Sequence, residues 1–158
     1  MDSSELCEAL SRVLLQRGWM LATAESCTGG MIAARCTDQA GSSQWFERGF
    51  VSYSNDAKSE LLGVPPELIA QHGAVSEAVA GAMASGAVQH ARAQVSVAVT
   101  GIAGPAGGSP DKPVGTVWFG WSVDGVVSTE RCVFGGDRAA VREATVQHAL
   151  QGLLKRLA

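Results

Sequence analysis

Aromatic residues are scarce in this sequence, and long apolar runs are absent. Its 158 residues include only four Trp, four Phe and one Tyr, which argues against a groove lined by aromatic side chains. No apolar run approaches the ~18 residues of a membrane-spanning helix. The acidic segment Met1–Glu5 also lacks the basic and apolar regions of a secretory signal. We therefore expect a cytoplasmic protein with no membrane partner.

An excess of positive charge is also missing. The chain has 12 Lys and Arg against 15 Asp and Glu, which gives a net charge of −3 at pH 7. Domains that bind nucleic acid are usually basic. The composition therefore predicts no nucleic-acid partner, although a local cationic pocket is compatible with it.

The cysteines form no local metal-binding motif. Cys7, Cys27, Cys36 and Cys132 contain no CxxC pair, and the three histidines lie far apart in the sequence. This pattern is typical of a reduced protein without a structural metal. A zinc site assembled from distant residues is the alternative.

The length corresponds to a single domain, residues 1–158. Pro65-Pro66 indicates a break, and Asp124-Gly125 predicts a tight hairpin. The early alternation of helices and strands, followed by this hairpin, predicts an α/β fold. We expect a three-layer α/β/α sandwich with a mixed, mostly parallel sheet and a late β-hairpin. Helices are predicted at 3–17, 31–38, 56–62, 77–91 and 138–157, a helical turn at 44–47, and strands at 19–24, 50–53, 94–100, 114–122 and 126–134.

The segment Glu25–Gly30 follows the first predicted strand, where open α/β sheets bind ligands. It carries hydroxyls at Ser26 and Thr28. Gly29 and Gly30 stand at a helix start, where free backbone N–H groups stabilise an anion or an oxyanion. The alternative is an ordinary strand-to-helix turn with a serine cap.

A second candidate segment, 52–58, holds the only tyrosine, Tyr53, and Lys58 about one helical turn beyond Ser54. A lysine in a poorly solvated pocket has a lowered pKa and can act as a base. A serine hydroxyl needs such a base to become a good nucleophile. The alternative is a solvated lysine on an exposed helix.

A third segment, Thr100–Gly108, is rich in glycine, including Gly101 and Gly104. It lacks the Gly-Lys-Ser/Thr ending of a Walker A loop, so we interpret it as another kind of phosphate or sugar cradle. The alternative is a flexible connection. Further along, Arg138 and Arg142 share one face of the last helix, which indicates either a bound anion or local pairing with acidic neighbours.

Cys27 offers a different chemistry. Its position beside a helix N-terminus is one that lowers the pKa of a thiol, which makes a cysteine-dependent enzyme a third hypothesis. However, no histidine falls in the strand-end segments. We therefore expect Cys27 to pack beneath its loop.

With these segments collected, the chain resembles the CinA C-terminal domain family over about residues 5–155. The matching segments occur in the family's order, and their combination is highly specific. They are AESCTGG at 24–30, GSS at 41–43 with Phe46, GFVSYSNDAK at 49–58, LGV at 62–64, HGAVS at 72–76, TGIAGP at 100–105 with Gly107-Gly108, KPVGTV at 112–117, and FGGDR at 134–138 with Val141-Arg142.

The resemblance implies a nicotinamide-nucleotide amidase. Such enzymes hydrolyse nicotinamide mononucleotide (NMN) to nicotinic acid mononucleotide and ammonia, by a serine/lysine type of catalysis without metal or cofactor. Larger family members carry a further N-terminal domain, so we expect the stand-alone form. The resemblance also implies a homo-oligomer. A non-catalytic nucleotide-binding or assembly module with this fold is the alternative function.

Carried over to this sequence, the resemblance implies a role for each matching residue. Lys58 would be the general base and Ser26 the nucleophile, with Ser43 as its rival. Tyr53 would donate a hydrogen bond or relay a proton.

The resemblance implies a substrate-binding set as well. Thr100 and the glycines after it, Gly101 and Gly104, would shape the nucleotide pocket. Arg138, with Arg142 behind it, would hold the 5′-phosphate. The backbone of Thr28, Gly29 and Gly30 would supply either an oxyanion hole or a phosphate cradle.

Overall fold

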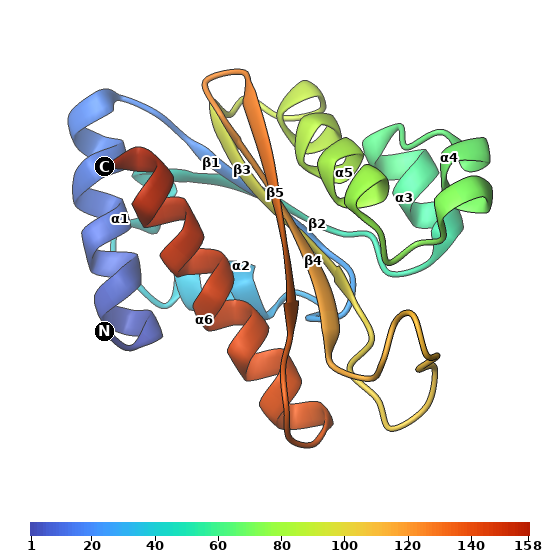
Figure 1. Cartoon of the computed structure of the whole chain (residues 1–158). Coiled ribbons are helices and arrows are strands. Elements are labelled where there is room, and N and C mark those ends of the chain that lie inside the picture. Colours follow the sequence, from blue (N-terminus) through green and yellow to red (C-terminus); the bar gives the residue numbers. More distant parts are fainter.

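Five strands form one mixed sheet in the computed structural model, which describes residues 1–158 (Figure 1). Their order is β2-β1-β3-β4-β5. β1 pairs in parallel with β2 and β3, whereas β4 is antiparallel to both β3 and β5, so only β4 runs against the others. The strands are β1 Leu21–Glu25, β2 Phe46–Val51, β3 Val95–Gly101, β4 Thr116–Val123 and β5 Val126–Val133.

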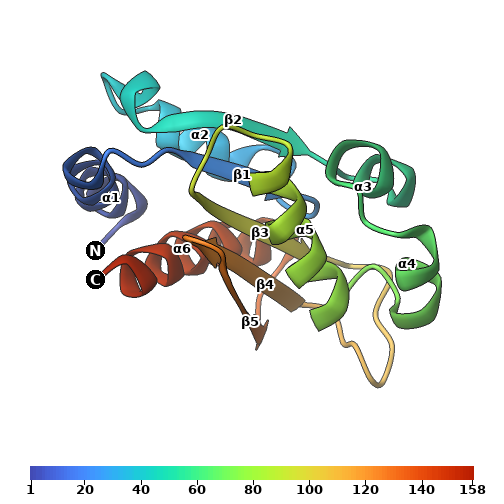
Figure 2. The same cartoon turned by 90° about the horizontal axis from the view of Figure 1, so that it is seen from above.

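Helices cover both faces of this sheet (Figure 2). One layer consists of α1 Ser3–Arg17, α2 Met31–Thr37 and α6 Arg138–Leu157. The other consists of α3 Asn55–Leu62, α4 Pro66–His72 and α5 Glu77–Gln89. The two layers and the β4–β5 hairpin confirm the predicted three-layer α/β/α architecture.

Strand alternation assigns side chains to the two cores. In β1, Leu21 joins the core under α1, α2 and α6, whereas Ala22 and Ala24 join the core under α5. Small residues let α5 approach the sheet closely. A Cβ atom at Gly120 would lie 2.4 Å from the Ala80 carbonyl oxygen. A side chain at that position would therefore push α5 away from β4.

The predicted helix ends agree with capping chemistry. The Asp2 carboxylate accepts a hydrogen bond from the Glu5 N–H at the start of α1, and Gly18 ends that helix with φ 66°. Ser54 caps α3, and Asp137 caps α6, each through its side-chain oxygen. The position of Lys58 in its helix is therefore set by a local signal in the sequence.

Two local predictions were wrong, and one helix was not predicted. The second strand begins at Phe46, so Tyr53 lies beyond its end, and the short helical turn is a 3-10 turn, η1, at Ser42–Gln44. The predicted break is present at residues 63–65, but the sequence did not predict the short helix that follows it, α4. It begins at Pro66, because a proline in the first turn of a helix needs no N–H partner.

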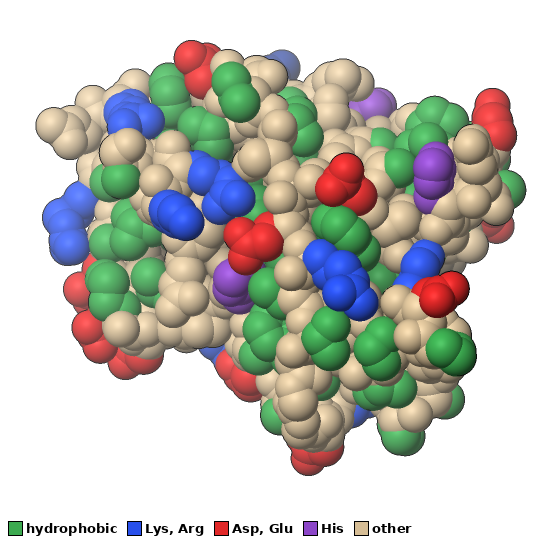
Figure 3. All heavy atoms as spheres, viewed as in Figure 1, with side chains coloured by type: hydrophobic (Ala, Val, Ile, Leu, Met, Phe, Trp, Pro, Cys, Tyr) green, Lys and Arg blue, Asp and Glu red, His purple; other side chains and the backbone are tan.

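The surface is mixed in charge. The face in Figure 3 carries lysine and arginine side chains among acidic ones. No helix combines the length and apolar character needed to cross a bilayer.

Candidate active site

A serine and a lysine meet at the carboxyl end of β1. Ser26 directly follows β1, and α3 directs Lys58 back toward it. The Lys58 Nζ lies 3.0 Å from the Ser26 Oγ. Both side chains are buried, with Lys58 only 1% exposed. The structure thus brings together two residues that are 32 positions apart in the sequence.

The main-chain carbonyl of Tyr53 is the third member of this cluster. It accepts hydrogen bonds from the Lys58 Nζ at 3.0 Å and from the Ser26 Oγ at 3.2 Å. The Tyr53 side chain is 59% exposed and makes no hydrogen bond with either residue. Tyr53 therefore orients the pair through its backbone, whereas the sequence analysis had assigned the role to its phenol.

Burial changes the acidity of Lys58. Desolvation lowers the pKa of its ammonium group, and the nearby Cys27 opposes this shift only in part. Lys58 forms no ion pair with a carboxylate. A buried amine without a counter-charge favours its neutral form, and the neutral form is the one that can accept a proton.

Glu25 holds the turn that presents Ser26. Its carboxylate accepts hydrogen bonds from the Thr28 hydroxyl at 2.5 Å, the Ile32 N–H at 2.8 Å and the Ala33 N–H at 3.0 Å. A buried carboxylate therefore caps α2, whose N-cap residue, Gly30, has no side chain to do so. The sequence analysis gave Glu25 no role. The available signal was a carboxylate at the end of an otherwise apolar strand.

Arg142 braces the same turn from α6. Its guanidinium donates to the carbonyls of Cys27 and Thr28, both at 3.2 Å. Gly29 and Gly30 continue the turn with positive φ. The Cys27 and Thr28 N–H groups donate to no other residue. The Cys27 N–H lies against its own thiol, and Cys27 lines the cavity, whereas Thr28 is fully buried and does not.

A cavity of about 210 Å³ opens above the pair. Of the predicted binding residues, Thr100, Gly101 and Arg138 line it, and Gly104 holds Arg138 through its carbonyl at 2.9 Å. The Thr100 hydroxyl donates to the Ala74 carbonyl at 2.9 Å, which ties β3 to the opposite wall. The complete lining is Ser26, Cys27, Tyr53, Asn55, Lys58, Ala74, Val75, Thr100, Gly101, Ala103 and Arg138.

Asn55, Ala74, Val75 and Ala103 are cavity residues that the sequence analysis missed. Asn55 begins α3, so its proximity to Lys58 offered a signal. The other three lie in irregular segments within the family motifs at 72–76 and 100–105, and that membership was the available signal.

Ser43 lies outside this site. It is exposed in η1, just before β2 begins. β1 and β2 are parallel, and the Leu21 N–H at the start of β1 donates to the carbonyl of Trp45, next to η1. Ser43 and Ser26 are therefore at opposite ends of the sheet. The structure does not bring Ser43 to Lys58, so its position does not support the predicted rivalry with Ser26.

Cys27 is buried beneath the turn, as expected. Desolvation raises the pKa of its thiol to about 12. The thiol is therefore protonated at neutral pH, and the hypothesis of a Cys27 thiolate nucleophile is not supported.

Comparison with known proteins places the chain among close relatives. The sequence profile of the CinA C-terminal domain matches residues 3–157. The nicotinamide-nucleotide amidohydrolase PncC of Escherichia coli (strain K12) is 55% identical over 150 residues, which cover 94% of this chain and 91% of that protein. PncC of Enterobacter agglomerans is 54% identical, with 96% and 93% covered. A CinA-like protein of Mycolicibacterium gilvum is 57% identical, but this chain covers only 34% of it.

Solved structures agree with this result. The competence damage-inducible protein A of Klebsiella pneumoniae superposes with a TM-score of 0.96 at 43% identity, covering 99% of this chain and 98% of that one. The competence/damage inducible protein CihA of Agrobacterium tumefaciens gives 0.95 at 46% identity, covering 98% and 95%. The chain therefore belongs to the CinA C-terminal domain family, as its motifs predicted.

Proposed function

We propose that this protein hydrolyses the carboxamide of NMN to nicotinic acid mononucleotide and ammonia. The contact that supports this proposal is the 3.0 Å approach of the Lys58 Nζ to the Ser26 Oγ at the floor of a cavity. The relatives named nicotinamide-nucleotide amidohydrolase, which match this chain over nearly their whole length, supply the substrate.

Acylation begins with proton transfer from serine to lysine. The neutral Lys58 amine takes the Ser26 proton while the Ser26 Oγ attacks the carboxamide carbon. A new C–O bond forms, and the carbonyl electrons move to the oxygen to give a tetrahedral oxyanion. The Tyr53 carbonyl, 3.0 Å from the Lys58 Nζ, accepts a hydrogen bond from the resulting ammonium group.

The turn after Ser26 provides a donor for the oxyanion. The Cys27 N–H lies at the cavity wall and donates to no other residue, so we assign it to the oxyanion. A preorganised donor of this kind lowers a barrier by about 3–4 kcal/mol. Glu25 and Arg142 hold the turn from its two sides, so the donor needs no rearrangement of the turn during the reaction.

Collapse of the intermediate releases ammonia. The Lys58 ammonium returns its proton to the departing nitrogen as the C–N bond breaks, which leaves an ester on Ser26. A water molecule, deprotonated by the neutral Lys58, then attacks this ester. As the C–O bond to Ser26 breaks, the Lys58 ammonium returns this proton to the Ser26 oxygen, which restores the hydroxyl and the neutral amine. The released carboxylic acid then loses its own proton to solvent to give the carboxylate product.

Arg138 is the residue we assign to the 5′-phosphate. It lines the cavity, and its bond to the Gly104 carbonyl fixes its position. A guanidinium suits a phosphate because it offers two parallel N–H donors. Arg142, in contrast, is engaged by the turn 26–30, so we assign it to support of that turn. The cytoplasmic location expected from the composition and the homo-oligomeric state implied by the resemblance stay predictions.

The test is ammonia release from NMN by the purified protein. We expect one ammonia for each NMN consumed. Because Ser26 and Lys58 act as a unit, Ser26→Ala and Lys58→Ala should each reduce kcat by about 10³-fold or more. Ser43→Ala, a matched serine outside the cavity, should retain wild-type activity. Binding of NMN by the folded protein without ammonia release would instead establish the non-catalytic binding module.

A further inference from the structure

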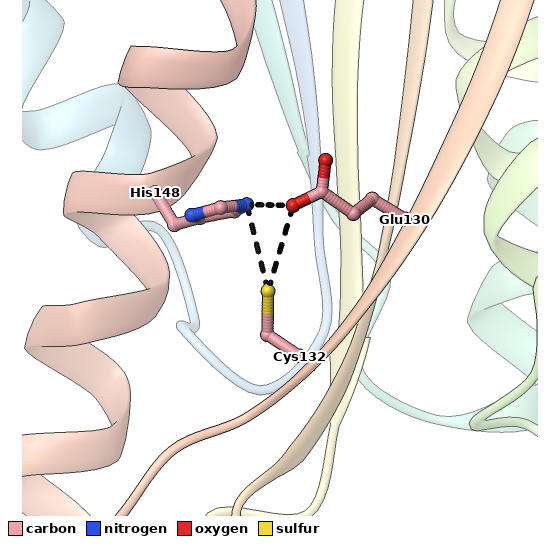
Figure 4. A group of neighbouring side chains, drawn as sticks. All are labelled: Glu130, Cys132 and His148. Carbon is pink, nitrogen blue, oxygen red and sulfur yellow. Dashed lines mark hydrogen bonds and ion pairs between the residues drawn. The ribbon is translucent and has the colours of Figure 1, made fainter.

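A second cluster of reactive side chains lies between β5 and α6. Glu130 and Cys132 are two residues apart on β5, so their side chains point to the same side of the strand. His148 projects from α6 toward both of them (Figure 4). None of the three lines the cavity above Ser26. The cluster is therefore separate from the proposed amidase site.

Three different ligand atoms converge at one point in this cluster. The His148 Nε2 lies 2.7 Å from the Glu130 Oε1 and 3.5 Å from the Cys132 Sγ. The Cys132 Sγ lies 3.7 Å from the same Glu130 oxygen. These contacts form the triangle drawn in Figure 4.

This arrangement differs from a catalytic relay. In a nucleophile–histidine–carboxylate relay, the nucleophile and the carboxylate bind opposite nitrogens of the imidazole ring. Here the thiol and the carboxylate both contact Nε2. In addition, burial and the Glu130 carboxylate raise the pKa of the Cys132 thiol, which opposes nucleophilic chemistry in the absence of a cation.

We propose that Glu130, Cys132 and His148 bind a divalent zinc ion, with water as the fourth ligand. Thiolate, imidazole and carboxylate are the three side-chain ligands of zinc. In a tetrahedral site with metal–ligand bonds of about 2.0–2.3 Å, ligand atoms are separated by roughly 3.3–3.6 Å. The two distances to the Cys132 Sγ, 3.5 and 3.7 Å, already approach these values. Only the Glu130–His148 contact must open.

The surroundings keep the ligands oriented. The His148 ring packs against Phe119, with ring centroids 4.7 Å apart, and beside Trp121 and Phe134. Arg156 lies 3.8 Å from the Oε2 of Glu130, which leaves Oε1 facing the cluster. The side chains of His148 and Glu130 are 27% and 41% exposed, so an ion and its water can enter.

Zinc at this position would connect the edge strand to the last helix. β5 ends the sheet, and α6 begins with Arg138 and Arg142 near the amidase cavity. The ion would link β5 to α6 through metal–ligand bonds. It would therefore stabilise the fold without taking part in the proposed amide hydrolysis.

The experiment is a zinc titration of the reduced, metal-free, full-length protein in competition with a chromophoric chelator. We expect one tight site. We also expect Tm to rise by roughly 5–10 °C when zinc exceeds its Kd 100-fold. Cobalt in place of zinc should give a thiolate-to-metal charge-transfer band. This readout is independent of NMN, so it remains informative even if the amidase proposal fails.

Cys132→Ser and His148→Ala should each weaken zinc binding about 100-fold and abolish the cobalt band. His72→Ala, which removes an exposed histidine at the end of α4, is the matched control and should bind like wild type. Glu130→Gln provides a second, nearly isosteric variant if the others fail to fold by circular dichroism. Absence of a tight site, or equal binding by wild type and the folded ligand variants, would overturn the proposal.

Discussion

A single buried amine controls the proposed chemistry at the residue scale. Lys58 is 1% exposed, yet its hydrogen-bond partners are a hydroxyl and a carbonyl, with no carboxylate among them. This environment disfavours the ammonium form. Desolvation therefore lowers the pKa of Lys58, so its neutral amine is more populated at a given pH than that of an exposed lysine.

The rate of NMN hydrolysis should depend on pH through Lys58. Because desolvation lowers the pKa of Lys58 from 10.5, the fraction of neutral amine grows as pH rises through this lowered value. We expect kcat for NMN to increase with pH over the same interval, with a midpoint below 10.5. A pH–rate profile under saturating NMN measures this midpoint. A kcat that stays constant from about pH 5 to 9 would contradict the role of Lys58 as the base.

At the scale of elements, the start of α2 depends on a residue outside the helix. Gly30 supplies the left-handed backbone that the turn needs but no capping side chain. Glu25 supplies the missing acceptors from the end of β1. The hydrogen bonds to Glu25 therefore join β1, the turn that carries Ser26 and α2 into one rigid unit.

We predict that Glu25→Gln weakens the cap at the start of α2. The glutamine keeps one acceptor oxygen but places an NH₂ group against a backbone N–H that needs an acceptor. We expect the free energy of unfolding to fall by about 1–3 kcal/mol and kcat to fall as well, because the turn carrying Ser26 loosens.

Urea denaturation and NMN turnover test the Glu25 prediction. Glu60→Gln, a change at an exposed acid on α3, serves as the control and should alter neither quantity. Equal stability and turnover in the Glu25 variant and in wild type would show that the cap does not hold the turn.

At the scale of the whole molecule, the site is assembled from segments that are distant in the sequence. The four residues come from four different elements: Ser26 follows β1, Lys58 lies within α3, Thr100 lies near the end of β3, and Arg138 begins α6. Parallel pairing of β1 with β3 aligns their carboxyl ends, which is where open α/β sheets bind ligands. α6 then brings two arginines to this edge.

Arg138 and Arg142 should affect different kinetic constants. Arg138→Ala should raise KM for NMN about tenfold or more, with a smaller effect on the nucleoside that lacks the phosphate. Arg142→Ala should instead lower kcat, because it frees the carbonyls of Cys27 and Thr28. Steady-state kinetics with both substrates provide the comparison. A larger KM increase for Arg142→Ala than for Arg138→Ala would reverse the assignment.

The helices could be predicted because the signals that begin them are local in the sequence. Asp2, Ser54 and Asp137 cap helices by bonding to residues three positions away, so their effect is contained in the sequence. The boundaries of β2 were predicted wrongly, and α4 was not predicted. The four-residue shift in the start of an edge strand and the proline-initiated helix both depend on packing against neighbours, which local periodicity does not record.

By itself, the sequence determined the three-layer class and its hairpin. The resemblance carried by its motifs also pointed to Ser26 and Lys58, with Ser43 as the rival nucleophile. Only the tertiary structure decided which serine meets the lysine, because parallel pairing of β1 and β2 sends the two serines to opposite ends of the sheet. It also shows that Tyr53 contacts the Ser26–Lys58 pair through its main-chain carbonyl and that Arg142 bonds to the turn after Ser26. Such roles depend on distances between remote segments, and these distances exist only after the chain has folded.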